Sequence, residues 1–135
     1  MVDSRVKGRA GEQELVRLLK DELGDKLEIT RVSHLQAGSK PLCDVFCGNW
    51  DIEVKRYKRP TEALIRVWWD QTIERHRQGQ LPCLAYRGDA QLWRFMTPMW
   101  KSSALYYTQT HYLEGFAMLV RESLPVSEAM GAFSF

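Results

Sequence analysis

The chain has 135 residues and a formal net charge of +2, which is the size of one ordinary domain. Hydrophobic residues make up 44% of it, enough for a core and too many for a globally disordered chain. No run of about 20 apolar residues occurs, so we expect no membrane span. The polar N-terminus lacks the apolar run of a signal peptide, so we expect a cytoplasmic protein.

The first predicted element is a helix over Gly8 to Leu23, because apolar residues recur near the helical period and Gly24 can end it. Alternation then predicts a strand over Leu27 to Val32. Residues 33–41 contain glycine, serine and proline, which is typical of a loop.

Residues 42–55 predict a β-hairpin, because two short runs rich in β-formers flank Gly48-Asn49. Alternate residues of a strand share a face, so Glu53 and Lys55 point the same way. On the partner strand Asp44 faces one side, whereas Cys43, Val45 and Cys47 would face the other. The hairpin can therefore bring two carboxylates and a lysine together on one face of the sheet.

The second half of the chain predicts a helix over Thr61 to Gln78, two strands over Leu81 to Arg87 and Gln91 to Met96, and a helix near Tyr112 to Glu122. The first seven elements follow the order αβββαββ. This order predicts an α/β protein with a mixed central sheet flanked by helices. We expect one domain over residues 1–135, with a core over 1–97 and a C-terminal extension over 98–135 that is a candidate dimer contact.

Two side-chain predictions accompany these elements. Trp68 and Trp69 are adjacent, so we expect only one of them to belong to the core. The three cysteines, an odd number widely spread, do not suggest a disulfide framework, and we interpret them as small buried hydrophobic residues.

Two neighbouring carboxylates repel each other, and both ionise most readily with a cation between them. Oxygen-rich sites of this kind suit Mg²⁺ or Mn²⁺. With a lysine beside them they form a sufficient set for phosphodiester hydrolysis. A surface hairpin with one salt bridge is the simpler alternative, because strand triplets with an acid and a lysine are common.

Three segments resemble the PD-(D/E)XK nuclease superfamily. Residues 41–46 (Pro-Leu-Cys-Asp-Val-Phe) and 52–55 (Ile-Glu-Val-Lys) resemble its paired motifs. The proline is displaced, because the residue directly before Asp44 is Cys43 and not a proline. Residues 7–15 (Lys-Gly-Arg-Ala-Gly-Glu-Gln-Glu-Leu) resemble the opening of archaeal-type Holliday-junction resolvases and related phage and prophage endonucleases. The resemblance covers roughly residues 5 to 96 and implies a restriction-endonuclease-like core.

The resemblance also implies roles for particular residues. The implied catalytic residues are Glu12, Asp44, Glu53 and Lys55. Mg²⁺, with Mn²⁺ as a substitute, would be held by Glu12, Asp44, Glu53 and the Val54 carbonyl, and Lys55 would position the attacking water. Glu14 is a competing candidate from the same helix, but it lies two residues on and so faces elsewhere.

Contacts to DNA are expected from the cationic run over 55–59, from the first helix, from a serine of the loop and from a glutamine of the second helix. The candidates are Lys7, Arg9, Ser33, Ser39, Arg56, Lys58, Arg59 and Gln71. The sequence does not choose between the two serines.

The implied function is a metal-dependent DNA endonuclease, structure-selective on branched DNA like a Holliday-junction resolvase. A homodimer is expected, because a four-way junction needs two nearly symmetric cuts. One alternative is a nicking, restriction-like or repair nuclease that acts on duplex or single-stranded DNA. Another is a non-catalytic DNA-binding module with the same fold.

Overall fold

The computed structural model describes residues 4–32, 42–99 and 107–130, which form an α/β fold with six strands and three helices. In chain order the elements are α1 (Ser4–Leu23), β1 (Ile29–Arg31), β2 (Val45–Cys47), β3 (Trp50–Arg56), α2 (Glu62–Arg75), β4 (Leu81–Arg87), β5 (Arg94–Pro98), β6 (Thr108–His111) and α3 (Leu113–Met130).

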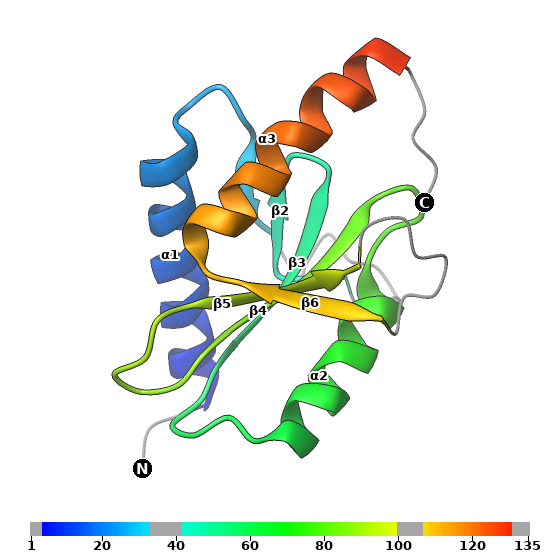
Figure 1. Ribbon diagram of the computed structural model, residues 1–135. Coiled ribbons are helices and arrows are strands. Elements are labelled where there is room, and N and C mark those ends of the chain that lie inside the picture. The colour runs from blue at the N-terminus through cyan, green and yellow to red at the C-terminus, as the bar shows by residue number, and fades with distance from the viewer. Residues whose placement is uncertain (1–3, 33–41, 100–106, 131–135) are drawn as a thin grey trace.

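The six strands form one mixed sheet in the order β1-β2-β3-β4-β5-β6. Neighbouring strands are antiparallel except β3 and β4, which are parallel and joined by α2. A parallel pair needs such a crossover, because a tight turn cannot return the chain to the same end of the sheet. Figure 1 shows that α2 and α3 lie on opposite sides of the β4–β6 part of the sheet. The predicted α/β class and mixed central sheet are therefore confirmed.

The hairpin forms as its sequence predicts. Cys47 pairs with Trp50, so Gly48 and Asn49 are the two residues of the turn. Gly48 has a φ of 58°, a conformation that glycine adopts without a steric penalty and that a two-residue hairpin turn requires. This short turn fixes the register of β2 against β3.

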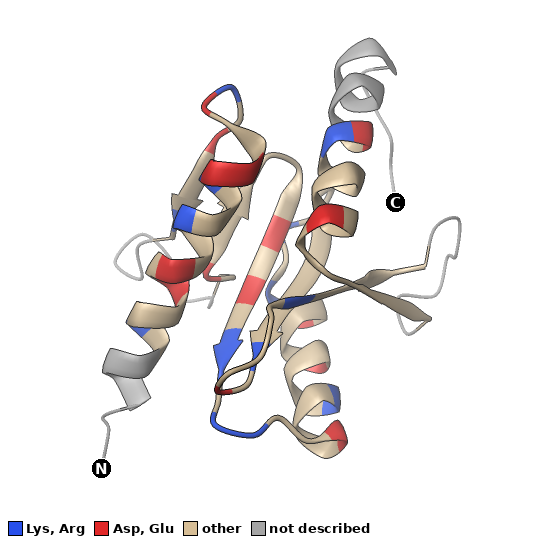
Figure 2. Ribbon diagram, turned by 60° about the vertical axis from the view of Figure 1, so that its left-hand side comes forward, with Lys and Arg blue, Asp and Glu red and all other residues tan. Residues whose placement is uncertain are grey.

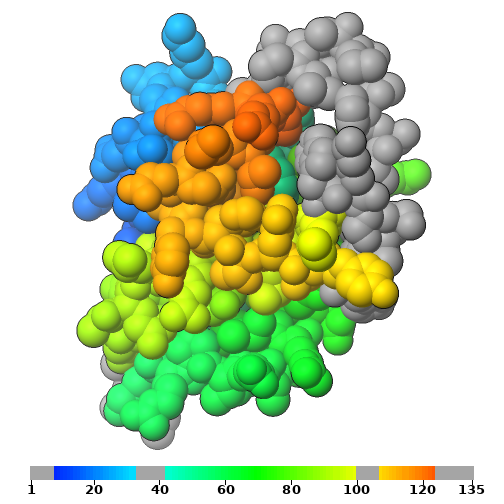
Figure 3. All heavy atoms as spheres, viewed as in Figure 1, coloured from blue at the N-terminus to red at the C-terminus, as the bar shows by residue number. Residues whose placement is uncertain are grey.

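The larger core lies between α1, α3 and one face of the sheet. Leu15 and Leu19 of α1 are fully buried against strand residues that include Val45 and Ile52. Phe116 of α3 joins the same core and stacks on Phe95 at a centroid distance of 4.6 Å. In the face shown in Figure 3, α3 (orange) fills the space between α1 and the yellow and green strands.

Residues after 98 therefore belong to the same core as the residues before them. β5 runs across position 97, and β6, which the sequence did not predict, pairs with it along Phe95 to Pro98. α3 begins one residue after the predicted start and continues eight residues beyond the predicted end. The apolar residues of this segment complete the core of the monomer, although Tyr107, Tyr112 and Met118 stay exposed.

A second, smaller core lies between α2 and the other face of the sheet, and here the sequence prediction was wrong. Trp68 and Trp69 are both buried, at 3% and 5% exposed. Trp68 packs against the rings of Tyr57 and Tyr86, whereas Trp69 lines a groove with Met96. Adjacent helical positions differ by about 100°, but the sheet under α2 extends from β3 to β5 and is wide enough to cover both.

The three cysteines are buried and free, as predicted. In the part of the chain that the structure describes, no helix combines the length and apolar character that a membrane crossing requires.

Candidate active site

The side chains of Asp44 and Glu53 come together on the first hairpin, where they interact directly. The regular pairing of β2 with β3 ends at Val45 and Ile52, and Asp44 lies in the bend just before it, where its amide donates to the Ile52 carbonyl at 3.0 Å. The Val54 amide donates to Asp44 Oδ2 at 2.9 Å. This bond holds the Asp44 carboxylate against β3, so the predicted convergence of the two carboxylates is confirmed.

Glu53 is fully enclosed yet only half satisfied. Its side chain is 1% exposed, and Oε1 accepts a bond from Arg75 Nη1 at 2.9 Å. Its other oxygen, Oε2, is buried and has no hydrogen-bond partner among the described residues. Burial, then the charge of the neighbouring Asp44 carboxylate and the hydrogen bond to it that a protonated Glu53 can donate, raise the pKa of Glu53 to about 8, against the opposing charges of Arg75 and Lys55. A second positive charge beside Oε2 would remove this penalty.

Lys55 and Gln71 complete the polar surroundings of the pair. Lys55 shares the Glu53 face of β3 and is half-buried. α2 and β3 run in opposite directions, since Arg75 contacts Glu53 while the Trp68 ring contacts Tyr57. Gln71 lies on the same side of α2 between those two contacts, and its buried Oε1 lacks a partner within the described part of the chain. Two unsatisfied acceptors thus border the same face of β3, which is rare in folded proteins.

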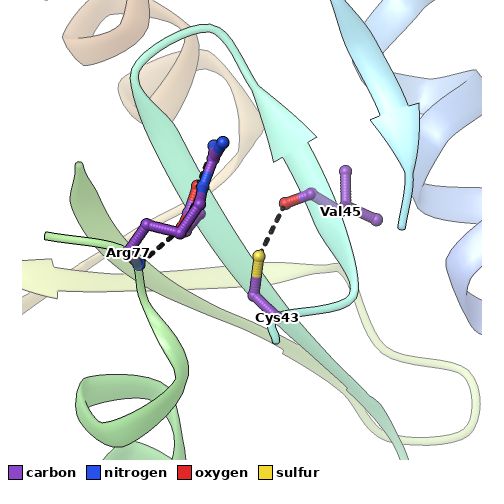
Figure 4. A network of polar contacts seen from close by, with 4 residues as sticks. Cys43, Val45 and Arg77 are labelled. Atoms are coloured by element: carbon purple, nitrogen blue, oxygen red, sulfur yellow. Dashed lines mark hydrogen bonds and ion pairs between the residues drawn. The ribbon is translucent and has the colours of Figure 1, made fainter. Parts of the chain in front are cut away.

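Asp51, two residues before Glu53 on the same face, is in contrast completely satisfied. Arg77 donates to it three times, from its amide at 2.8 Å, from Nε at 3.0 Å and from Nη2 at 2.7 Å. The Arg77 guanidinium also covers the Phe46 ring at 3.7 Å from the centroid. Figure 4 shows Arg77 and its dashed contacts lying along β3.

The side chain of Cys43 was assigned to the apolar face of the hairpin, and that assignment was wrong. Its thiol donates to the Val45 carbonyl at 3.6 Å, as Figure 4 shows. Burial, followed by the charges of Asp51, Asp44 and Glu53, raises the pKa of the Cys43 thiol well above its ordinary value. β2 begins only at Val45 and Asp44 sits in a bend, so strict alternation does not extend back to Cys43.

Glu12, the carboxylate expected from α1, is not grouped with Asp44 and Glu53. It forms an ion pair with Arg31 of β1, whose Nε lies 3.5 Å from Glu12 Oε1. α1 packs on the Val45–Ile52 face of the sheet, whereas Asp44 and Glu53 lie on the α2 face. The metal role of Glu12 stays a prediction from the resemblance.

The competing residue Glu14 is a structural anchor. Its Oε1 accepts bonds from Arg87 Nε at 3.2 Å and from Trp93 Nε1 at 3.1 Å, and its Oε2 lies 3.6 Å from Arg56 Nε. Gly11 allows α1 to come this close, since a Cβ there would lie 3.1 Å from the Arg56 Cβ. Glu14 therefore ties α1 to β3, β4 and the residue before β5.

The expected DNA-contacting residues are distributed unevenly. Lys58 and Arg59 are exposed in the turn after β3, and Arg9 is exposed on α1. Figure 2 shows acidic bands along β3 followed by basic residues at its end and in this turn. Arg56 alternates to the α1 face, where Glu14 occupies it. The side chain of Lys7 and the residues Ser33 and Ser39 lie outside what the structure describes.

The site offers two carboxylates for a metal ion. Nowhere in residues 8–32, 42–99 and 107–123, whose side chains are described, do three or more histidine, cysteine or acidic side chains gather closely enough to hold one. Mg²⁺ retains several waters and is commonly held by only one or two carboxylates. The unsatisfied Oε2 of Glu53, with Asp44 beside it, therefore fits a hydrated Mg²⁺ or Mn²⁺ ion.

Sequence reasoning missed three residues of this face: Asp51, Arg75 and Arg77. Asp51 could have been found, because alternation along β3 places it on the face of Glu53. The two arginines follow one another at i and i+2 near the end of the predicted helix, but no local pattern shows which strand residues they meet.

The comparisons with known proteins identify no relative, since neither a family model nor a curated protein matches the chain.

Proposed function

We propose that the protein is a metal-dependent DNA endonuclease of the PD-(D/E)XK type, with a restriction-endonuclease-like core. The preferred substrate in this proposal is branched DNA. The observation that carries the proposal is the paired arrangement of Asp44 and Glu53, in which a buried carboxylate oxygen has no hydrogen-bond partner among the described residues. Buried polar groups are normally satisfied, and an exception indicates a missing ligand or a strained functional group.

A Mg²⁺ ion bound there would supply Lewis-acid polarisation of the phosphodiester. Asp44 would hold the ion with the oxygen that does not accept from Val54, and Glu53 with Oε2. Lys55, on the same face and half-buried, would orient the attacking water and offset negative charge that develops on the phosphate. Gln71 would accept a hydrogen bond from a water of the ion's hydration shell through its unsatisfied Oε1.

The charge distribution supports an anionic polymer as substrate. Lys58 and Arg59 are exposed at the end of β3 that Lys55 approaches. Exposed cations of this kind contribute a sequence-independent, salt-sensitive attraction to the phosphate backbone. A strand that reaches the carboxylate pair would pass this turn.

The preference for branched DNA rests on the resemblance of residues 7–15 to resolvases. Its test is a substrate panel of synthetic four-way junction, flap, linear duplex, single strand and plasmid, each with Mg²⁺ and with a chelator. We expect the junction to be cut fastest and chelator to abolish every product. Equal cutting of junction and linear duplex would favour the nicking or repair-type alternative instead.

The same panel tests catalysis itself. If wild-type protein cuts none of these substrates but binds them, the non-catalytic DNA-binding alternative is correct. Sedimentation with and without the junction tests the proposed homodimer, since two nearly symmetric cuts require two active sites related by a two-fold axis.

A further inference from the structure

Arg75 is partly exposed although its partner Glu53 is buried, and it contacts that partner through a single hydrogen bond, whereas Arg77 contacts Asp51 through several. Arg75 Nη1 donates to Glu53 Oε1, yet its side chain remains 30% exposed while that of Glu53 is 1% exposed. A guanidinium has five N–H donors in a planar fork, and one of those of Arg75 donates to Glu53.

Arg75 and the expected metal ion would use different oxygens of Glu53. Arg75 holds Oε1, whereas Oε2 is the atom that has no partner among the described residues. Metal binding therefore does not need to displace Arg75. The guanidinium would stay beside the ion, with donors left over for another group.

The charges around Arg75 indicate which kind of group its remaining donors would bind. With both carboxylates ionised, as metal ligands are, the formal charges of Asp44, Glu53, Lys55 and Arg75 sum to zero. A divalent cation would bring the cluster to +2. Such a site attracts an anion, and a planar guanidinium matches the oxygens of a phosphate.

We propose that Arg75 is a phosphate-binding residue, which contacts a non-bridging oxygen of the substrate phosphodiester while it holds Glu53 in place. This inference rests on the proposed function for the identity of the substrate, but not for the binding of a phosphate group. Arg77 does not share the role, because its guanidinium is occupied by Asp51 and covers the Phe46 ring.

The first test uses wild-type protein and inorganic phosphate, with the arginine Nε–H resonances followed by NMR at constant ionic strength. We expect the Arg75 resonance to shift with phosphate, and the shift to grow when Mg²⁺ is present. Arg66 is the control, because it lies about two and a half turns earlier on α2 and so points to the opposite side. An Arg75 resonance that does not move, or moves no more than that of Arg66, would overturn the proposal.

The second test measures the salt dependence of DNA binding with Ca²⁺ in place of Mg²⁺, which allows binding to be followed without turnover. Loss of one phosphate contact lowers the slope of log K against log salt by about 0.9 for duplex DNA. We expect this decrease for Arg75→Gln and no change for Arg66→Gln. Arg75→Lys keeps the charge near Glu53 and should recover the slope partly, whereas a structural role alone would leave the slope unchanged in all three variants.

The two proposals fail differently. If Arg75→Gln binds Ca²⁺ and DNA with the wild-type slope, the inference about Arg75 is wrong and the nuclease proposal stands. If wild-type protein binds no divalent cation and cuts no DNA, the nuclease proposal is wrong, and the phosphate titration still decides whether Arg75 binds an anion. Should Arg75→Gln fold poorly, the titration of the wild type alone gives the answer.

Discussion

Two buried carboxylates two residues apart on β3 are partnered in opposite ways. Asp51 is 0% exposed, and three donors of Arg77 saturate it. Glu53 is 1% exposed, but one of its oxygens has no partner among the described residues and its neighbour is a second carboxylate. The Asp51–Arg77 ion pair is therefore fully hydrogen-bonded, whereas the Glu53–Asp44 pair leaves one buried oxygen without a donor among the described residues.

The difference indicates that one acidic residue of β3 serves mainly to stabilise the fold, whereas the other is suited to bind a ligand. A saturated buried ion pair stabilises the fold relative to losing one of its partners. An unsatisfied carboxylate pair costs free energy, which a folded protein retains mainly where a ligand supplies what is missing. Substitutions at the two positions should therefore affect different measurements.

The largest expected effect is on cleavage. Asp44→Asn, Glu53→Gln and Lys55→Met should each lower the rate of Mg²⁺-dependent DNA cleavage by at least about a hundredfold, with DNA binding largely retained. Single-turnover cleavage of the best substrate measures this. Asp70→Asn is the matched control, since Asp70 is exposed on α2. Wild-type cleavage by any of the three variants would refute the role given to that residue.

The next largest effect is on stability and concerns the Asp51–Arg77 ion pair. Asp51→Asn should lower the free energy of unfolding by about 2 kcal/mol, because the charge-assisted hydrogen bonds from Arg77 to this buried side chain are weakened, while the partly exposed Arg77 stays solvated. Urea denaturation measures the change. Exposed Glu74 on α2 provides the control, and Glu74→Gln should stay within about 0.5 kcal/mol of wild type. If Glu53→Gln destabilised the protein more than Asp51→Asn, the contrast between the two pairs would be wrong.

A smaller effect concerns pH. The pKa of Glu53 is raised to about 8 in the metal-free fold, from an ordinary value of 4.5, so the folded state binds a proton more tightly than the unfolded chain. This contribution to stability is fully present below pH 4.5 and is lost as pH rises through about 8. Glu53→Gln should remove that decline. Urea denaturation of both proteins in chelator at pH 5 to pH 8 checks it, and parallel pH profiles would contradict it.

The smallest expected effect separates Glu12 from the hairpin carboxylates. Glu12 is paired with Arg31 on the other face of the sheet, so Glu12→Gln should weaken Mn²⁺ binding less than Glu53→Gln does. Calorimetric titration of both variants measures the order. The reverse order would show that Glu12 joins the metal site in solution, as the resemblance to resolvases implies.

Much of the candidate site follows from local rules. Period-two alternation places Glu53 and Lys55 on one face, and the two-residue turn at Gly48-Asn49 sets the register of β2 against β3, which brings Asp44 close to Glu53. α2 begins after its N-cap Thr61, close to its predicted start. Such features depend on neighbours in the sequence, so the sequence is sufficient to predict them.

Other features depend on partners that are far apart along the chain. The sequence did not predict β6, since Thr-Gln-Thr-His is short and polar and becomes a strand only by pairing with β5. It also assigned Trp68 or Trp69 to the surface, because helical periodicity does not show how wide a sheet lies beneath the helix. In both cases tertiary packing overrode the local signal.

The sequence by itself determined that Glu53 and Lys55 share one face of β3, since alternation leaves no other arrangement, and the tight turn brought Asp44 near them. Only the tertiary structure decided how those charges are partnered. The crossover between the parallel strands β3 and β4 lays α2 against that face, and residues 22 and 26 positions apart then meet as Arg75–Glu53 and Arg77–Asp51. The same packing turns Arg56 and Glu14 toward each other on the opposite face. Electrostatic partnership depends on three-dimensional distance, which the spacing of residues along the chain does not fix.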